Sequence, residues 1–202
     1  WEKLRGRFWW PLVRVELKAH LEGCQPCQRA RREKRKKAFL QRNLEATQVF
    51  EVMACDLMTL PEDEEGFTYL LVVLEFVSSF VWAIPLKDKK AETIAETLRD
   101  RVFVPVSWPR ILLTDNGGEF RNKVLGTVCG QGGTHQRFTS PYHPQADGRV
   151  ERTNRTLLGL LRTAGGGNIR RWREDLPFVV SGWNQSPNPS NGLSPGQLLY
   201  GT

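Results

Sequence analysis

The sequence lacks the features of several large classes of protein. It has no apolar run of about eighteen residues and no charged-then-apolar leader with a cleavage site, so neither a transmembrane helix nor a signal peptide is visible. Its four cysteines are scattered over 202 residues and do not form the disulfide framework of a small secreted protein. We therefore expect a reducing compartment and no membrane partner. Because the chain begins at Trp1 rather than Met, we also expect a fragment of a longer protein.

Repeats and common catalytic groups are missing as well. No internal repeat or low-complexity segment is present, and the length suits one ordinary domain with a small appendage. Only three histidines occur, and no Ser-His-Asp or Cys-His arrangement is visible. Any catalysis by this chain therefore has to depend on other side chains.

Positive charge is in excess, and it is concentrated in two segments. The formal net charge is +7. Residues 29–37 hold seven basic residues and one acid, and residues 149–173 hold seven arginines and one acid, so the remainder is mildly acidic. Two basic segments on such a chain are typical of a protein that grips a polyanion. For residues 29–37, a solvated helix face or a nuclear-localisation-like run is the alternative.

The N-terminal segment predicts a small helical unit that is too short to form a core unaided. The pattern indicates two helical pieces broken at Pro11, and Trp9 and Trp10 are expected to pack rather than to stack on a ligand. The apolar residues of this unit are Leu4, Phe8, Val13, Val15 and Leu17.

A metal ion would explain how so small a unit holds together. Cys24 and Cys27 form a C-x-x-C pair, which is half of a tetrahedral zinc site. The nearest histidine, His20, has a spacing to Cys24 that fits no standard zinc finger. We therefore expect His20 to be a surface or packing residue first and a ligand second.

A larger α/β domain is predicted from about residue 46 onwards. Three apolar and β-branched runs predict an antiparallel meander, at residues 50–58, 67–76 and 79–86. Helix, strand, helix, strand and helix then follow, at residues 89–106, 110–115, 119–131, 134–138 and from about 149. The tail predicts a helix over residues 172–184 and another from Ser194. This order is typical of a mixed sheet with helices on both faces.

Three acids have special places in this scheme. Asp56 is predicted at the end of the first strand, Asp115 at the end of strand 110–115, and Glu151 in the first turn of the following long helix. Strand ends of one sheet lie close together, and a helix across that edge can bring its acid to the same place. Converging carboxylates repel one another, so we expect divalent cations, Mg²⁺ or Mn²⁺, between them. The alternatives are a turn role for Asp115 and a solvated Glu151–Arg155 pair.

The spacing of the acids connects them to a known family. Thirty-five residues separate Asp115 from Glu151. This spacing, with the segments "TDNGGEF", "YHPQADGRVERTNRTLLGLLR" and "NQSPNPSNGLSPGQLLYG", strongly resembles the integrase of gypsy-type LTR retrotransposons and retroviruses. The segment "RFWWPLVRVELKAHLEGCQPCQRAR" resembles the second half of the zinc-binding domain in the same polyproteins. The resemblance implies an RNase H-like five-stranded sheet in residues 46–202, preceded by a zinc-domain remnant and basic linker in residues 1–38.

The same resemblance implies an activity and a set of residues. The expected activity is that of a polynucleotidyl transferase and endonuclease, which trims the 3′ ends of element DNA with Mg²⁺ and joins them to target DNA. Asp56, Asp115 and Glu151 match its catalytic metal ligands, and Cys24 and Cys27 match its zinc ligands. The residues that match DNA-contacting positions are Tyr142, Gln145, Arg149, Asn154 and Arg155. A homo-oligomer acting on DNA in the nucleus is implied as well.

Two departures from the family pattern stand out. The histidines that complete the zinc site normally precede the Trp1 position, so we expect zinc to be weakly held or absent. The segment "LEFVSS" has Glu75 where the family usually has an aspartate, and this change bears on local structure rather than on metal binding. A domesticated, catalytically inactive protein that binds nucleic acid is the alternative function, although the presence of all three acids favours the enzyme.

Overall fold

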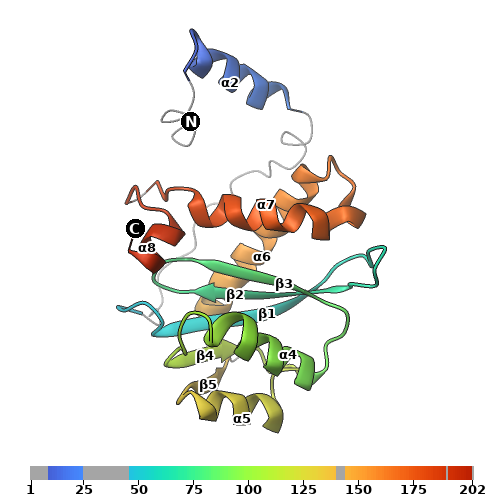
Figure 1. The fold of residues 1–202 in the computed structure, drawn as a ribbon, viewed down its shortest axis with the longest axis vertical. Helices are drawn as coiled ribbons and strands as arrows, with labels where there is room; N and C mark the ends of the chain where they lie inside the picture. Colours follow the sequence, from blue (N-terminus) through green and yellow to red (C-terminus); the bar gives the residue numbers. More distant parts are fainter. Residues whose placement is uncertain (1–8, 25–45, 140–143, 190, 202) are drawn as a thin grey trace.

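The structure is a computed structural model that describes residues 9–24, 46–139, 144–189 and 191–201, with the backbone alone for residues 144–147. Its centre is a five-stranded sheet with the strand order β3-β2-β1-β4-β5 (Figure 1). The strands are β1 (Val52–Thr59), β2 (Tyr69–Glu75), β3 (Val81–Leu86), β4 (Ile111–Thr114) and β5 (His135–Phe138). All five were predicted from the sequence.

The sheet is mixed, as the sequence predicts. β1 pairs with β2, and β2 with β3, in antiparallel ladders that form the expected meander. On its other side β1 pairs with β4, and β4 with β5, in parallel ladders. Parallel neighbours need crossover connections, and the helical segments between β3, β4 and β5 supply them.

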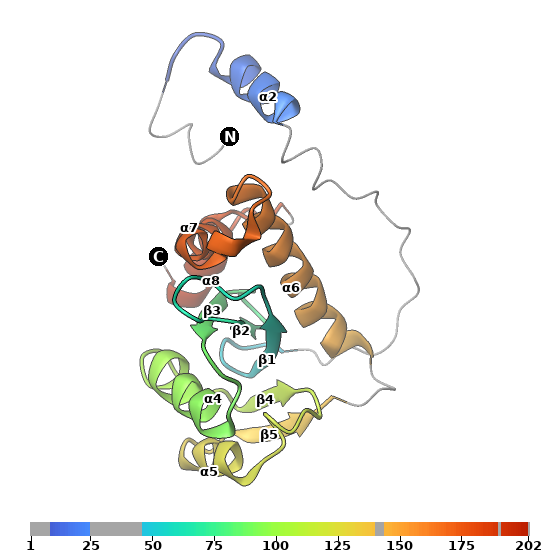
Figure 2. The ribbon, with the colours of Figure 1, turned by 90° about the vertical axis from the view of Figure 1, so that its right-hand side faces the viewer.

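Helices cover both faces of the sheet (Figures 1 and 2). One face packs against α6 and α7, and the other packs against α4, a following π-helical turn and α5. The helical elements are α2 (Val13–Gly23), α4 (Ala91–Leu98), η1 (Arg99–Phe103), α5 (Lys123–Gln131), α6 (Pro144–Ala164), η2 (Ile169–Arg171), α7 (Trp172–Gln185) and α8 (Pro195–Tyr200). The predicted mixed five-stranded sheet with helices on both faces is therefore confirmed, whereas the zinc-domain remnant stays a prediction.

Strand alternation explains the two halves of the core. Val52 and Ala54 of β1 point to the face of α6 and α7, whereas Met53 and Cys55 point to the face of α4 and α5. The largest side chain in the first half is Trp172, which is fully buried and donates its indole N–H to the Pro61 carbonyl at 2.9 Å. Because both faces are covered, β1 and β2 are apolar along nearly their whole length.

Two predictions about the acids need correction. Asp56 does not end its strand, because the ladder of β1 with β2 continues to Thr59. Glu151 is not in the first turn of its helix, because α6 already begins at Pro144. Proline suits the first helical position, where no backbone N–H is needed, and an interior Gly148 costs only about 1 kcal/mol relative to alanine.

The N-terminal helix also differs from its prediction. The break at Pro11 is confirmed, since α2 begins at Val13, and Figure 2 shows α2 apart from the sheet. Val13 is buried, but Trp9, which was expected to pack, is 83% exposed, and nothing in the described part of the chain covers it. Val15, from the apolar set of the same unit, is 62% exposed. The boundaries 1–38 and 46–202 stay predictions.

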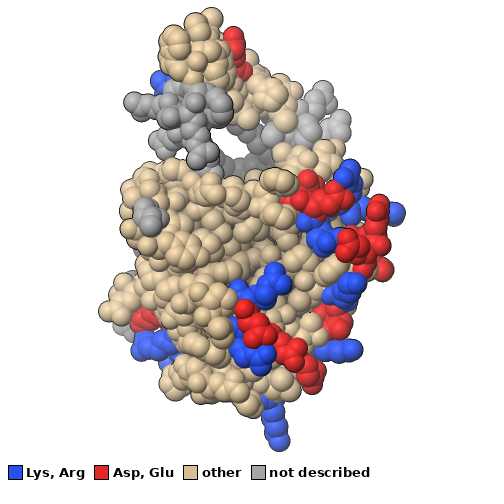
Figure 3. Space-filling model, in the orientation of Figure 1, with Lys and Arg blue, Asp and Glu red and all other residues tan. Residues whose placement is uncertain are grey.

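No helix in the described ranges has the length and apolar character needed to cross a membrane. Charged side chains of both signs gather along one side of the face drawn in Figure 3, and the rest of that face is mostly uncharged.

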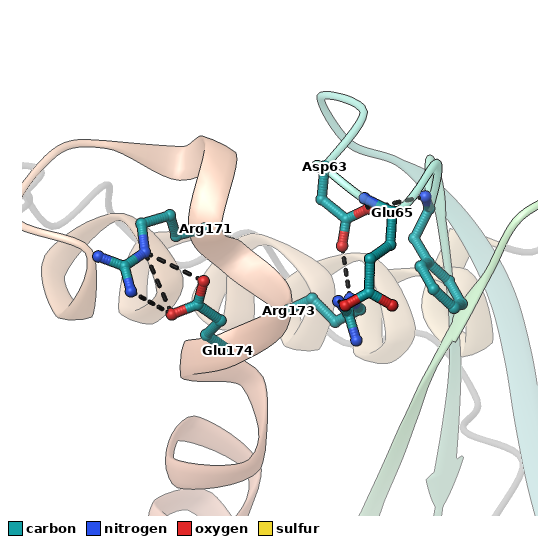
Figure 4. Close-up of polar contacts among 6 residues, drawn as sticks. Asp63, Glu65, Arg171, Arg173 and Glu174 are labelled. Atoms are coloured by element: carbon teal, nitrogen blue, oxygen red, sulfur yellow. Dashed lines mark hydrogen bonds and ion pairs between the residues drawn. The ribbon is translucent and has the colours of Figure 1, made fainter.

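A charged clamp ties α7 to the loop between β1 and β2 (Figure 4). Arg173 of α7 reaches across to Asp63 and Glu65 of that loop and donates to both carboxylates. Its guanidinium also lies 4.8 Å from the centre of the Phe67 ring. The side chain of Asp63 is only 6% exposed and accepts two further hydrogen bonds, from the backbone N–H groups of Glu65 and Phe67.

This clamp predicts an acid-dependent loss of stability. Burial raises the pKa of Asp63, but the Arg173 hydrogen bond and the two backbone N–H groups outweigh it and hold the pKa below its ordinary value of 3.8. A carboxylate with a lowered folded pKa stabilises the fold above its unfolded pKa, and that contribution is lost as the pH falls through the folded pKa. Asp63→Asn should therefore lower the melting temperature at neutral pH, and the difference from wild type should vanish towards about pH 2.

The control for this experiment is Asp100→Asn. Asp100 pairs with the adjacent Arg99, and its side chain is 54% exposed, so solvent screens the pair and the melting temperature should change much less than in Asp63→Asn. A pH-independent difference between Asp63→Asn and wild type would contradict the assignment.

Candidate active site

The register between β1 and β4 brings two of the predicted acids together. Ala54 of β1 is paired with Leu113 of β4, and Asp56 and Asp115 each come two residues after this pair. Side chains two residues apart on a strand point to the same face, so both acids are expected on the face of Ala54 and Leu113, which α6 covers. Asp56 is still held by β2 at this point, through its pairing with Val72. The two acids therefore lie where β1 and β4 begin to separate.

The third acid reaches the same place from α6. Asp56, Asp115 and Glu151 all line one small cavity of about 200 Å³. Its walls also include Thr139 at the end of β5 and Val150 of α6. Glu151 is exposed, and among the described residues no ion pair joins it to Arg155. The structure thus favours a shared site over the solvated pair.

Hydrogen bonds orient the two aspartates. Asp56 accepts from the backbone N–H of Leu57 at 2.8 Å and from the side-chain amide of Asn154 at 2.7 Å. Asp115 accepts from the backbone N–H of Gly117 at 2.9 Å. The loop after Asp115 is tied down in turn, since the Asn116 amide donates to the Thr139 carbonyl at 2.8 Å. These contacts fix the direction of both carboxylates at the cavity.

One thiol also lines the cavity, but it is not a nucleophile. Burial raises the pKa of the Cys55 thiol well above its ordinary value, and the neighbouring Asp56, Cys129 and Asp115 raise it further. Burial likewise raises the pKa of Cys129, to about 11. Because the thiolate is the reactive form of cysteine, these shifts disfavour attack by either thiol. The described polar groups at the cavity that suit a cation are the carboxylates of Asp56, Asp115 and Glu151.

Comparison with known proteins now identifies the domain. Residues 46–144 match the family model described as "Integrase core domain". The chain carries an integrase core domain. The match contains Asp56 and Asp115 but ends before Glu151.

Retroviral polyproteins are related to this chain over a longer range. It is 26% identical over 199 residues to the Pro-Pol polyprotein of Simian foamy virus type 3 (strain LK3), covering 98% of this chain and 17% of that protein. It is 35% identical over 139 residues to the Pol polyprotein of Radiation murine leukemia virus (strain Kaplan), covering 67% of this chain and 23% of that protein. The chain thus spans about a sixth to a quarter of these relatives. The predicted kinship with retroviral integrases is confirmed.

A solved structure with the same fold supports this result. The chain is similar to one in the cryo-EM structure of the simian T-cell lymphotropic virus intasome in complex with PP2A regulatory subunit B56 gamma. The TM-score is 0.68 and the sequence identity is 20%, over 92% of this chain and 66% of that chain. At this identity the likeness concerns the fold alone.

The donor atoms at the integrase core's cavity fit a hard divalent cation. Within the described ranges, no three His, Cys, Asp or Glu side chains are grouped as ligands of one metal ion. Magnesium usually takes only one or two carboxylates and completes its shell with water and substrate phosphates. The Asn154 Oδ1 atom adds a further observation, because it is buried with no protein partner and can accept a hydrogen bond from a water. Asp56, Asp115 and Glu151 would therefore hold cations singly or in pairs, with water and phosphate oxygens as the other ligands.

The predicted DNA-contacting residues of α6 have three different surroundings. Arg155 is exposed, as a phosphate contact requires. Asn154 is buried and serves Asp56, so it belongs to the cavity. Arg149 is half-buried and donates to the Phe76 carbonyl at 2.6 Å, so it faces the turn between β2 and β3.

Several other predicted site residues cannot be placed in the same way. Cys27 and Tyr142 lie outside the described residues, and for Gln145 only the backbone, within α6, is described. Cys24 is half-buried just after α2, and His20 is exposed in the last turn of that helix. The zinc site therefore stays a prediction.

A fourth acid stands beside Asp115, and the sequence reasoning missed it. A Cβ added to Gly117 would lie 2.7 Å from the Glu119 Oε2 atom and 3.0 Å from the Asp115 Oδ1 atom, so these oxygens are at most 5.7 Å apart. Glycine at position 117 is what allows both carboxylates to approach the backbone there. The signal was present in the segment "TDNGGEF", where Glu119 was read only as part of the motif.

A metal-binding test follows from this cavity. Adding Mg²⁺ should raise the melting temperature of the wild type. At a free Mg²⁺ concentration of one hundred times Kd, the folded state should be stabilised by about 2.7 kcal/mol. Asp115→Asn should lose most of this rise, and without metal it should be at least as stable as wild type because one repelling charge is gone. The measurement is thermal unfolding with and without Mg²⁺. Glu92→Gln is the control, since it removes an exposed charge on α4, and an equal rise in Asp115→Asn and wild type would refute the site.

Proposed function

We propose that this chain is the catalytic part of an integrase that joins element DNA to target DNA. The observation that carries the proposal is the cavity shared by Asp56, Asp115 and Glu151, three acids distant in sequence within an integrase core fold. The enzyme would be a polynucleotidyl transferase with two reactions. Water first cleaves a phosphodiester near the 3′ end of the element DNA, and the freed 3′-hydroxyl then attacks a phosphodiester of the target. Each step forms one P–O bond and breaks another.

The three acids would have different roles in this reaction. Asp56 and Asp115 are fixed by hydrogen bonds from Asn154, Leu57 and Gly117, so they form the rigid side of the site. Glu151 approaches from α6 and closes the site. Bound Mg²⁺ or Mn²⁺ would activate the attacking oxygen and stabilise the leaving oxygen of the in-line displacement. Among the described residues that line the cavity there is no histidine or lysine and the thiol is buried, which is consistent with a reaction driven by carboxylate-bound cations.

The exposed side of α6 would hold the DNA backbone. Arg152, Arg155 and Arg162 are exposed there, and within the described residues no acid forms an ion pair with any of them. Arg152 and Arg155 follow Glu151 by one and four residues, within about one helical turn. Arginines free to contact phosphates beside a catalytic acid suit a polynucleotide substrate.

The wider setting of the enzyme is proposed from the same function. Integration requires access to chromosomal DNA, so we place the activity in the nucleus, in an assembly of several copies. Zinc at Cys24 and Cys27 would belong to the preceding domain and is expected to be weakly held. A catalytically inactive descendant that only binds nucleic acid is the competing function.

The catalytic assignment is tested by Glu151→Gln. This change keeps the size of the side chain and removes its charge, so the protein should fold and bind DNA while strand transfer falls by about 10³-fold or more. The measurement is Mg²⁺-dependent joining of a labelled end duplex to target DNA. Glu92→Gln serves as the control for a lost surface acid. Wild-type protein that binds DNA without joining it would favour the inactive descendant.

The DNA grip is tested by Arg155→Ala. If Arg155 contacts a phosphate, the slope of log affinity against log salt should become shallower by about 0.9. Binding to an end duplex is measured over a range of salt concentrations. Arg171→Ala is the matched control, because Arg171 is exposed but already engaged with Glu174 (Figure 4), and its slope should equal that of wild type. An unchanged slope in Arg155→Ala would put this residue outside the DNA path.

A further inference from the structure

A buried acid and a half-buried arginine lie next to the active site without belonging to it. Glu75 ends β2 and is fully buried, at 0% exposure. Arg149 is in the second turn of α6, two residues before Glu151. Neither side chain lines the cavity of the three acids. Burying an acid and an arginine is costly unless both are well satisfied, so their surroundings call for an explanation.

Glu75 organises the tight turn between β2 and β3. Its carboxylate accepts hydrogen bonds at 2.6 Å from both the backbone N–H and the hydroxyl of Ser78, and one at 3.3 Å from the backbone N–H of Phe50. The turn needs this support, because Ser79 has a left-handed φ of 62°. Glutamate is long enough to make these contacts from the last position of the strand. The turn supported by Glu75 is therefore the local structure that accompanies the replacement of the family's usual aspartate by Glu75.

Arg149 attaches α6 to the same turn. Its guanidinium donates to the Phe76 carbonyl at 2.6 Å and contacts the Ser79 hydroxyl at 3.5 Å. It also lies 4.4 Å from the centre of the Phe76 ring. Burial lowers the pKa of Arg149 and the attraction of Glu75 opposes this, so the guanidinium remains charged. Glu75 and Arg149 thus meet at one turn from two elements.

The placement of Glu151 depends on such attachments. Glu151 is exposed, and among the described residues its carboxylate has no hydrogen-bond or ion-pair partner, so only the helix sets its direction. Two polar contacts fix this stretch of α6, from Arg149 to the turn on one side and from Asn154 to Asp56 on the other. Residues two apart on a helix point about 200° away from each other. With Arg149 held at the turn, Glu151 is directed to the opposite side.

We propose that Arg149 is a positioning residue: anchored to the Glu75-supported turn, it fixes the rotation of α6 so that Glu151 faces Asp56 and Asp115. This inference rests on the proposed function for its effect on catalysis. It also reassigns Arg149, which the sequence predicts as a DNA contact. The two arginines would then have different roles: Arg149 directs Glu151, and Arg155 binds the DNA substrate.

Kinetics and salt dependence separate the two roles. Arg149→Ala should lower kcat of strand transfer by about 10- to 100-fold, as expected for a displaced catalytic group, and leave KM for DNA and the salt slope unchanged. Arg149→Lys keeps the charge and a donor for the Phe76 carbonyl, so it should recover most of kcat. Arg155→Ala should show the opposite split, and Arg171→Ala should change neither quantity. A raised KM and a shallower slope in Arg149→Ala, with kcat intact, would overturn the inference.

A second measurement does not depend on activity. Amide hydrogen exchange of the full chain should become faster in residues 149–155 of Arg149→Ala and stay unchanged in α7. Unaltered exchange in residues 149–155 would overturn the positioning role. If the wild type fails to join DNA, the proposed function fails, and the exchange result still decides whether Arg149 holds α6.

Two milder variants cover the case in which Arg149→Ala does not fold. Glu75→Gln keeps the shape of the side chain and removes its charge, and Glu75→Asp restores the residue usual in the family. Each should lower kcat and speed exchange in residues 149–155, in the same direction as Arg149→Ala, with KM unchanged. Wild-type values of kcat and of exchange in both Glu75 variants would overturn the inference.

Discussion

The parallel pairing of β1 with β4 is the constraint on which the candidate site depends. Its register pairs Ala54 with Leu113, two residues before Asp56 and Asp115, on the face that α6 covers, and both acids line one cavity. A slip of one residue would turn Asp56 into the apolar layer of α4 and α5, away from Glu151. The register is held by the core itself, because Ala54 and Met53 fit only their own faces. The packing of the sheet therefore also determines where the acids lie.

The long helix α6 completes the site and connects its parts. Its buried residues Leu157 and Leu161 pack on the sheet, while its exposed arginines face solvent. Between these two faces, Arg149 and Asn154 make polar contacts on either side of Glu151. Such buried polar contacts add direction to hydrophobic packing, which by itself is not directional. Glu151, for which we propose a catalytic role, has no hydrogen-bond or ion-pair partner among the described residues and needs this kind of support.

Much of the fold could be predicted from local pattern, and the errors have physical causes. All five strands, the helices on both faces and the helix break at Pro11 follow from periodicity and breaker residues. The start of α6 was misplaced because "PYHPQADG" has the composition of a loop, although Pro144 can begin a helix. Trp9 was expected to pack because aromatic residues usually do, but within the described structure nothing covers it. The surroundings of Arg149 were missed because the β2–β3 turn lies more than seventy residues away in the chain.

The sequence by itself determined the order of elements, the two basic segments and the identity and spacing of the three acids. These are properties of residue type and chain position, and no folding is needed to see them. Only the tertiary structure decided which charged residues serve the fold and which are free for a substrate. Arg149, Arg155 and Arg173 are chemically alike, yet one faces a turn, one faces solvent and one clamps a loop. Burial and long-range partners make that difference, and neither is a local property of the chain.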